Sequence, residues 1–206
     1  MKAYEIKKFF RLNEKGKSII GARKETVNHK ERVERLSKKK VINKIKRNES
    51  KAEVREIRNG YAQIAKFREK ARLQPYSLES GDTVAMVKVN GRIYHGVNSG
   101  ITENSRLATR DLRNKWLNEV DWVPPKKNAP KHLGQVQSLT HAESHALIRA
   151  YERQGALPQQ LTMYVDRVTC NICRGEMPAL LKRVGVDELT IYSGGSTNPL
   201  IIKAIK

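Results

Sequence analysis

The sequence predicts an α/β domain with a mixed five-stranded sheet flanked by helices, in which the last two strands are antiparallel. Two observations predict this fold class. Strand-like and helix-like segments alternate through the C-terminal half of the chain, as they do when helices cover a sheet. The final two strand-like segments, Leu189–Tyr192 and Leu200–Ile205, are joined by only seven residues. So short a connection can turn an antiparallel hairpin, but it cannot hold the helical crossover that a parallel pair needs.

The first strands are expected to form a hairpin. Thr83–Val89 is rich in β-branched and apolar residues, and the chain returns over Arg92–Val97. Between them, Asn90-Gly91 is the strongest short turn signal, because a type I′ turn needs residues that accept a positive φ. A helix is expected within Asn104–Val120, followed by a loop over residues 123–138, where prolines and a glycine gather.

Two helices and one strand are expected in the next part of the chain. His141–Arg153 is predicted to be a helix that ends at Gly155, a residue suited to a left-handed C-cap. Leu161–Val165 is the strand. A second helix is expected over Cys170–Val184, again followed by a glycine, Gly185.

The positive charge of the chain is unevenly spread and suggests two parts. The 206 residues contain 41 Lys and Arg against 21 Asp and Glu, a formal net charge of +20. Residues 1–72 hold 24 basic and 9 acidic residues, whereas residues 73–206 hold 17 and 12. We therefore expect a basic helical extension over 1–72 and a separate domain of ordinary charge over 73–206. Such an extension favours nucleic acid as a partner, although a solvated basic helix without a specific partner is the alternative.

One helix of the extension, over residues 50–72, is better defined than the rest. Ser50 and Glu53 are spaced as a capping box at its start. Apolar residues then recur at steps of three and four, which predicts a stripe that docks on another part of the protein. Asn59-Gly60 lies inside the helix and could interrupt it. The stripe consists of Val54, Ile57, Tyr61, Ile64 and Phe67.

A membrane location is not expected. No apolar run approaches the ~20 residues that a membrane-spanning helix requires. The N-terminus has no apolar core of the kind found in signal peptides, because Arg11, Asn13 and Glu14 follow Phe9-Phe10.

The residues most informative about chemistry are His141-Ala142-Glu143 and, after a helix and a strand, Cys170-x-x-Cys173. We expect His141, Cys170 and Cys173 to hold one zinc ion. Three N and S ligands leave one coordination position open for water, as catalytic zinc requires. Glu143 is expected not to be a ligand but to move protons beside the metal.

Other interpretations of the same residues remain open. Thr140-x-x-Glu143 is also a capping box, so Glu143 could only close the start of a helix. Cys170 and Cys173 could be a redox pair or half of a structural zinc site. A site of four cysteines within one chain is excluded, because the sequence contains only two.

Residues 83–206 resemble the cytidine-deaminase fold, and within it the deaminase domains of bacterial polymorphic toxins, in particular the group with double-stranded-DNA cytosine deaminases. The short C-terminal hairpin matches the branch of this superfamily whose last strands are antiparallel. The resemblance rests on His141-Ala142-Glu143, on Cys170-x-x-Cys173, on the strand Leu161–Val165, and on Met177–Leu181 with Leu189–Tyr192.

The resemblance also implies substrate contacts. Asn98, at the end of the second strand, occupies the place of an asparagine that binds the nucleotide sugar in many cytidine deaminases, although it could merely end the strand. Backbone groups from Thr169 to Asn171 would read the exocyclic amine of the base. Thr169 stands where the family usually has proline, which puts the shape of the pocket wall in doubt. His145, one turn after His141, is expected to pack or to support the site rather than to bind metal.

The function that the resemblance implies is hydrolytic deamination of cytosine to uracil in DNA, double- or single-stranded, by an interbacterial toxin domain. The toxin would be delivered into a target cell without a visible signal peptide, would act in its cytoplasm, and would require an immunity protein in its producer. Two alternatives remain. One is a deaminase of RNA or of free cytidine or its nucleotides, and the other is a non-catalytic nucleic-acid-binding protein with a structural zinc.

Overall fold

The computed structural model describes residues 34–40, 43, 50–74, 76–77, 82–98, 103–122 and 133–206 of the chain. The chain divides into two compact units, Met1–Glu53 and Val54–Lys206. In the first unit residues 34–40 are helical, and most of the predicted basic extension lies outside the described residues. The second unit contains the sheet.

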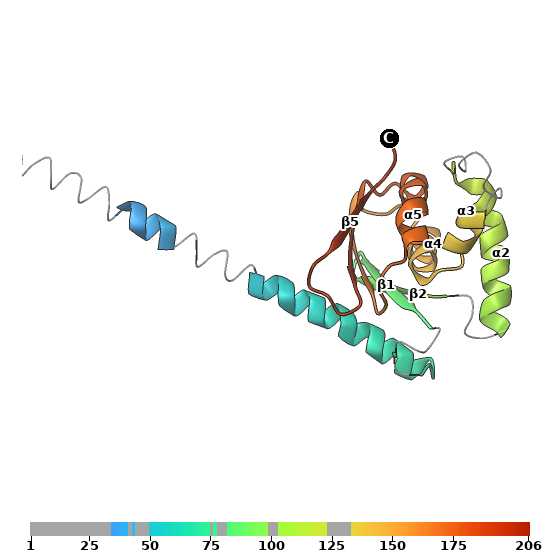
Figure 1. Ribbon diagram of the computed structural model, residues 1–206, viewed down its shortest axis with the longest axis horizontal. Helices are drawn as coiled ribbons and strands as arrows, with labels where there is room; N and C mark the ends of the chain where they lie inside the picture. Colours follow the sequence, from blue (N-terminus) through green and yellow to red (C-terminus); the bar gives the residue numbers. More distant parts are fainter. Residues whose placement is uncertain are drawn as a thin grey trace, which may run out of the picture. The chain divides into compact units, whose positions relative to one another are not determined.

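The second unit follows the predicted order of strands and helices (Figure 1). A helix over residues 54–70 comes first. The elements after it are β1 (Val84–Val89), β2 (Arg92–Val97), α2 (Glu103–Glu119), α3 (Leu133–Ser138), α4 (Ala142–Gln154), β3 (Gln160–Val165), α5 (Asn171–Val184), β4 (Glu188–Ser193) and β5 (Leu200–Lys203).

One expectation was wrong. The loop predicted over residues 123–138 ends early, because Leu133–Ser138 forms the short helix α3. Gln135 is buried there and its amide donates to the carboxylate of Glu176 on α5. Packing against α5 thus stabilises a helix too short to persist by itself. Residues 123–132 lie outside the described part of the chain.

The sheet has the order β2-β1-β3-β4-β5. Strand β1 pairs antiparallel with both β2 and β3, and β3 pairs parallel with β4. Strand β5 pairs antiparallel with β4, with Leu189 opposite Ile202. The prediction that the last two strands are antiparallel is confirmed, and so is the mixed five-stranded sheet.

Both faces of the sheet are covered. Successive side chains of a strand point to opposite faces. In β1, Ala85 and Val87 belong to the larger core, which also contains buried residues of α4 and α5. Val84 and Met86 point the other way and pack with Ile64 of the helix over residues 54–70. The predicted apolar stripe of that helix is therefore docked on the second face of the sheet.

The helix over residues 54–70 is continuous through Asn59-Gly60. A Cβ on Gly60 would overlap the ring of Tyr164 on β3, so the glycine permits a close approach instead of causing a break. Tyr61 packs edge-on against the same ring, with centroids 6.1 Å apart. The boundary at residue 72 stays a prediction, but this helix and the sheet belong to one compact unit.

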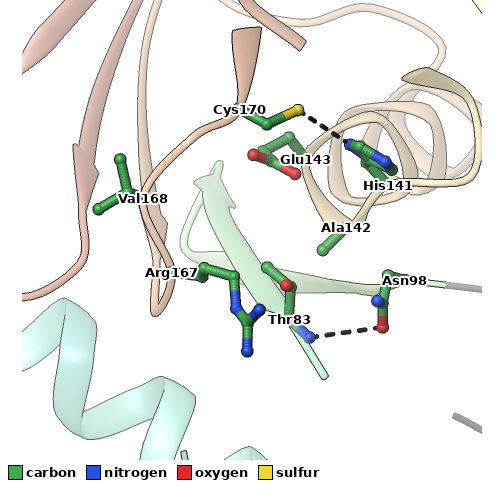
Figure 2. Close-up of a pocket in the computed structure, with 8 residues that line it drawn as sticks. All are labelled: Thr83, Asn98, His141, Ala142, Glu143, Arg167, Val168 and Cys170. Atoms are coloured by element: carbon green, nitrogen blue, oxygen red, sulfur yellow. Dashed lines mark hydrogen bonds between the residues drawn. The ribbon is translucent and has the colours of Figure 1, made fainter. Parts of the chain in front are cut away.

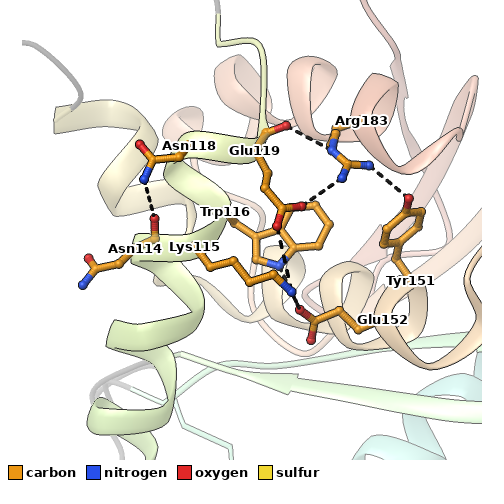
Figure 3. A network of polar contacts seen from close by, with 8 residues as sticks. All are labelled: Asn114, Lys115, Trp116, Asn118, Glu119, Tyr151, Glu152 and Arg183. Atoms are coloured by element: carbon orange, nitrogen blue, oxygen red, sulfur yellow. Dashed lines mark hydrogen bonds and ion pairs between the residues drawn. The ribbon is translucent and has the colours of Figure 1, made fainter.

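Polar contacts join α2 to α4 and α5 (Figure 3). Arg183 of α5 forms an ion pair with Glu119 of α2 at 2.9 Å and donates to the Tyr151 hydroxyl of α4 at 3.0 Å. Lys115 of α2 pairs with Glu152 of α4 at 2.8 Å. These contacts hold α2 against α4 and α5, the two helices that begin immediately after His141 and Cys170.

Candidate active site

Helix α4 begins immediately after His141. This residue is the N-cap, with an extended backbone and no side-chain capping bond, and Gly155 closes the helix in the left-handed conformation. The capping box considered for Thr140 and Glu143 is not formed, because the Thr140 hydroxyl donates to the carbonyl oxygen of Gln137 at 2.7 Å. Glu143 therefore has no role as the partner of a capping threonine.

Helix α5 begins immediately after Cys170. Its thiol sulfur, as the N-cap, accepts a hydrogen bond from the backbone N–H of Cys173 at 3.4 Å. Capping of this kind places both sulfurs at the first turn of α5. The Cys-x-x-Cys spacing is thus determined by the first turn of one helix, and a spacing of this local kind can be recognised in the sequence.

The two helix starts bring three donor atoms together. His141 Nδ1 lies 3.0 Å from Cys173 Sγ and 3.4 Å from Cys170 Sγ. Within the described residues these three side chains form a group whose ligand atoms all lie within 4.8 Å of one another, and the group could hold a metal ion. One imidazole nitrogen and two sulfurs fit the ligand preference of zinc.

The protonation of the cysteines bears on this fit. Burial raises the pKa of the Cys173 thiol above its ordinary value, and the nearby Glu143 and Cys170 act in the same direction. Burial lowers the pKa of His141, which favours the neutral imidazole that metals bind. A divalent cation among the donors would reverse the effect on Cys173, since a coordinating thiol loses its proton.

Glu143 lies in the first turn of α4 and is only 3% exposed. Burial raises the pKa of its carboxyl group, while the Cys173 and Thr169 side chains, among other groups, oppose the shift. The carboxyl group lines the cavity beside Cys170 and His141 but is not a member of the donor group (Figure 2). It is therefore placed to exchange protons with a molecule in the cavity.

The cavity itself is small. Its volume is about 210 Å³, below the roughly 300–1,000 Å³ of typical ligand pockets. It suits a single planar base, with the rest of a nucleotide outside. Among the described residues, those that line it are Thr83, Asn98, His141, Ala142, Glu143, Arg167, Val168 and Cys170.

Two sides of this cavity differ in origin (Figure 2). The motif wall consists of His141, Glu143 and Cys170, which line the cavity, together with Cys173, which contacts His141 but does not line it. These residues belong to the starts of α4 and α5. The strand-end wall consists of Thr83, Asn98 and Arg167, which precede β1, follow β2 and follow β3. In the view of Figure 2 the labelled residues of the strand-end wall lie on the other side of the cavity from those of the motif wall.

The predicted substrate contacts are placed differently from one another. Asn98 lines the cavity, and its side-chain oxygen accepts from the backbone N–H of Thr83 at 3.4 Å. Thr169 is buried beside Glu143, and Asn171 is exposed at the first position of α5. Neither of these two lines the cavity. The roles of all three stay predictions.

His145 lies outside the donor group, as expected, and is fully buried. One ring nitrogen, Nδ1, lies 2.6 Å from the carbonyl oxygen of Val97, and Nε2 lies 2.8 Å from that of Leu139. The ring therefore joins the end of β2 to the segment that precedes α4. It thereby connects the residue before Asn98, on one wall of the cavity, to the segment before His141, on the other wall.

Gly96 brings β2 into direct contact with α4. A Cβ at this position would overlap the backbone of Ala142 and of Ala146. The backbones of β2 and α4 therefore touch at Gly96, two residues before Asn98, and at Ala142, the residue after His141.

The sequence did not point to the ion pair that supports the strand-end wall. Arg68 pairs with Asp166 at 2.7 Å, and both side chains are nearly buried. Asp166 also accepts from the backbone N–H of Val84 at 3.0 Å. Arg167 follows directly and lines the cavity. The charged residues Asp166 and Arg167 stand just before the cysteines in the sequence, and this position could have marked Arg167 as a candidate site residue. Nothing in the sequence links Asp166 to Arg68.

Comparison with known proteins gives one result. A family model described as MafB19-like deaminase matches residues 62–205, which include the five strands and every residue of the cavity. Searches of the curated proteins and of the solved structures found no significant match. Separately, none of the helices in the described part of the chain combines the length and apolar character needed to cross a membrane.

Proposed function

The chain belongs to the MafB19-like deaminase family, a cytidine-deaminase-like family of polymorphic toxins, and from this premise we propose that it is a zinc-dependent hydrolase that deaminates cytosine to uracil in DNA. The single observation that carries the proposal is the convergence of His141, Cys170 and Cys173 next to the buried Glu143. A redox pair or a structural zinc site has no need of a buried carboxyl group that faces a cavity.

The reaction is the addition of water at C4 of cytosine and the loss of the amino group as ammonia. Bound at His141, Cys170 and Cys173, zinc would supply Lewis-acid activation of water at neutral pH. Glu143 takes a proton from the water, gives it to the ring nitrogen N3, and assists the departure of ammonia. Its location on the cavity wall, outside the donor group, supports this assignment.

Charge supports a polymeric substrate. Residues 1–72 carry 24 basic and 9 acidic residues. A free nucleoside carries no phosphate and would gain nothing from such a segment, whereas DNA binding is favoured by the release of counterions. In a duplex the target base must leave the stack, at a cost of a few kcal/mol that contacts in the pocket must recover.

The test uses the full chain loaded with zinc. Wild type and Glu143→Gln are incubated with matched single-stranded DNA, double-stranded DNA, RNA and free cytidine, and conversion is followed by sequencing and by ammonia release. We expect C-to-T conversion in DNA, reduced about 10²- to 10⁴-fold in the variant. Conversion of RNA alone, or of cytidine alone, would replace DNA by that substrate in the proposed function. No conversion of any substrate would leave a structural zinc as the better interpretation.

As a toxin domain, the protein would be delivered into a target cell and act in its cytoplasm. Its producer would then need an immunity protein, and a basic deaminase would favour an acidic one that covers the cavity. Expression of wild type without such a protein should arrest growth and cause C-to-T mutations, whereas Glu143→Gln should do neither. Equal growth of the two strains would contradict the toxin role.

A further inference from the structure

We propose that Arg167 is a phosphate-binding residue, which contacts a phosphate attached to the nucleotide whose base occupies the cavity. The substrate class would accordingly be a nucleotide or a polynucleotide rather than a nucleoside. The proposal rests on the proposed function in one respect, namely that the reacting base faces the motif wall.

Arg167 lies on the side of the cavity toward which the sugar and phosphates of such a substrate would extend. C4 of the base must face Glu143 and the metal donors, so the sugar and its phosphates extend away from the motif wall. Arg167 lies on the strand-end wall, with Thr83 and Asn98, on the other side of the cavity (Figure 2). Of the described residues that line the cavity, it is the one that carries a permanent positive charge.

The volume of the cavity indicates where a phosphate of the substrate would lie. About 210 Å³ accommodates a base but not a whole nucleotide. A phosphate on the substrate must therefore lie at the rim. Arg167 is half-buried and lines the cavity on the side away from the motif wall, where such a phosphate would lie.

The guanidinium group of Arg167 is also held in place. Its Nη2 donates to the carbonyl oxygen of Ser77 at 3.3 Å, and its central carbon lies 5.8 Å from the centre of the Tyr76 ring. The neighbouring acid, Asp166, forms its short ion pair with Arg68 and also attracts the charge of Arg167. A planar guanidinium that is positioned in advance loses little freedom on binding a phosphate, and it can donate two parallel hydrogen bonds to it.

The experiment is a coupling measurement between Arg167 and the charge of the phosphate. The substrates are short single-stranded oligodeoxynucleotides with one cytosine, with ordinary phosphates or with neutral methylphosphonates on both sides of that cytosine. Wild type, Arg167→Gln and Arg167→Lys are compared by kcat/KM. Arg153→Gln is the control with the same loss of charge, because Arg153 is exposed in the last turn of α4, about 17 Å along the helix from the motif wall.

We expect Arg167→Gln to lower kcat/KM roughly 10- to 100-fold on the ordinary substrate and less than twofold on the methylphosphonate substrate. Arg167→Lys, which keeps the charge without the planar group, should lie between wild type and Arg167→Gln. Arg153→Gln should match wild type on both substrates. An equal loss on both substrates for Arg167→Gln would overturn the proposal, because it would mean that Arg167 only supports the fold.

A binding arm separates this proposal from the deaminase assignment. The affinity of the same oligonucleotides is measured by fluorescence anisotropy in the Glu143→Gln background, with and without Arg167→Gln. The two changes should again be coupled. Coupling in binding, together with no deamination of any substrate by the wild type, would refute the proposed function and keep the phosphate contact. Deamination by the wild type without any coupling would keep the proposed function and refute the phosphate contact.

Discussion

The motif wall and the strand-end wall of the cavity are built in opposite ways. His141 and Glu143 are two residues apart, and Cys170 and Cys173 three, so each pair is positioned by the first turn of one helix. Thr83, Asn98 and Arg167 come from the ends of three strands and meet only because the sheet is paired correctly. In the proposed function, local helix geometry therefore supplies the groups for chemistry, and tertiary structure supplies those for recognition. Substitutions should separate the two.

The largest effect is expected at the motif wall. Cys173→Ser replaces a sulfur donor by a poor zinc ligand, so bound zinc should fall from one equivalent to near zero and deamination should be lost. Metal content by atomic emission and activity on DNA are the measurements, and Cys170→Ser should behave alike. A variant that keeps one equivalent of zinc and its activity would contradict the assignment of Cys173.

The support of the strand-end wall comes next. Arg68→Met leaves the Asp166 carboxylate without its short ion pair in a nearly buried position. We expect the free energy of unfolding to fall by about 3–5 kcal/mol, measured by urea denaturation. Arg68→Met with Asp166→Asn should recover part of the loss, because an asparagine can still accept from Val84. Arg58→Met, exposed on the same helix, is the control and should change little.

The connection between the walls predicts a dependence on pH. Burial, the largest cause, lowers the pKa of His145 to about 4, although the two carbonyl oxygens beside the ring favour its protonated form. In the unfolded chain the pKa is about 6.5. The unfolded state therefore binds the extra proton between pH 6.5 and 4, and the free energy of unfolding should fall through that range by up to about 3 kcal/mol.

An NMR titration of the His145 ring measures its pKa directly, and His145→Phe should weaken the dependence of stability on pH. A ring pKa above 6.5 would show that the bonds to Val97 and Leu139 outweigh burial.

The smallest effect is expected away from both walls. Arg183 and Glu119 keep 34% and 31% of their side chains exposed. Arg183→Gln should therefore cost about 1 kcal/mol or less and leave kcat/KM on DNA unchanged. A large loss of activity would mean that α2 affects the cavity through this contact.

Much of the fold and of the motif wall could be predicted because its signals are local. Asn90-Gly91 turns the first hairpin, Gly155 and Gly185 end α4 and α5, and the short C-terminal connection fixes the last pairing. The pairing of Arg68 with Asp166 could not be predicted, because 98 residues separate them. Helix α3 was missed for a similar reason, since its stability comes from α5 rather than from its own sequence.

The contact at Gly96 has a consequence for how such a cavity can change in size. Because β2 touches α4 without an intervening side chain, the spacing of the two backbones is at its minimum, and with it the separation of Asn98 from His141. Trimming the residues that line the cavity would deepen it but leave its walls where they are. Adding a methyl group at position 96, outside the cavity, would push the walls apart. The width of the cavity therefore depends on Gly96, a residue that does not line it.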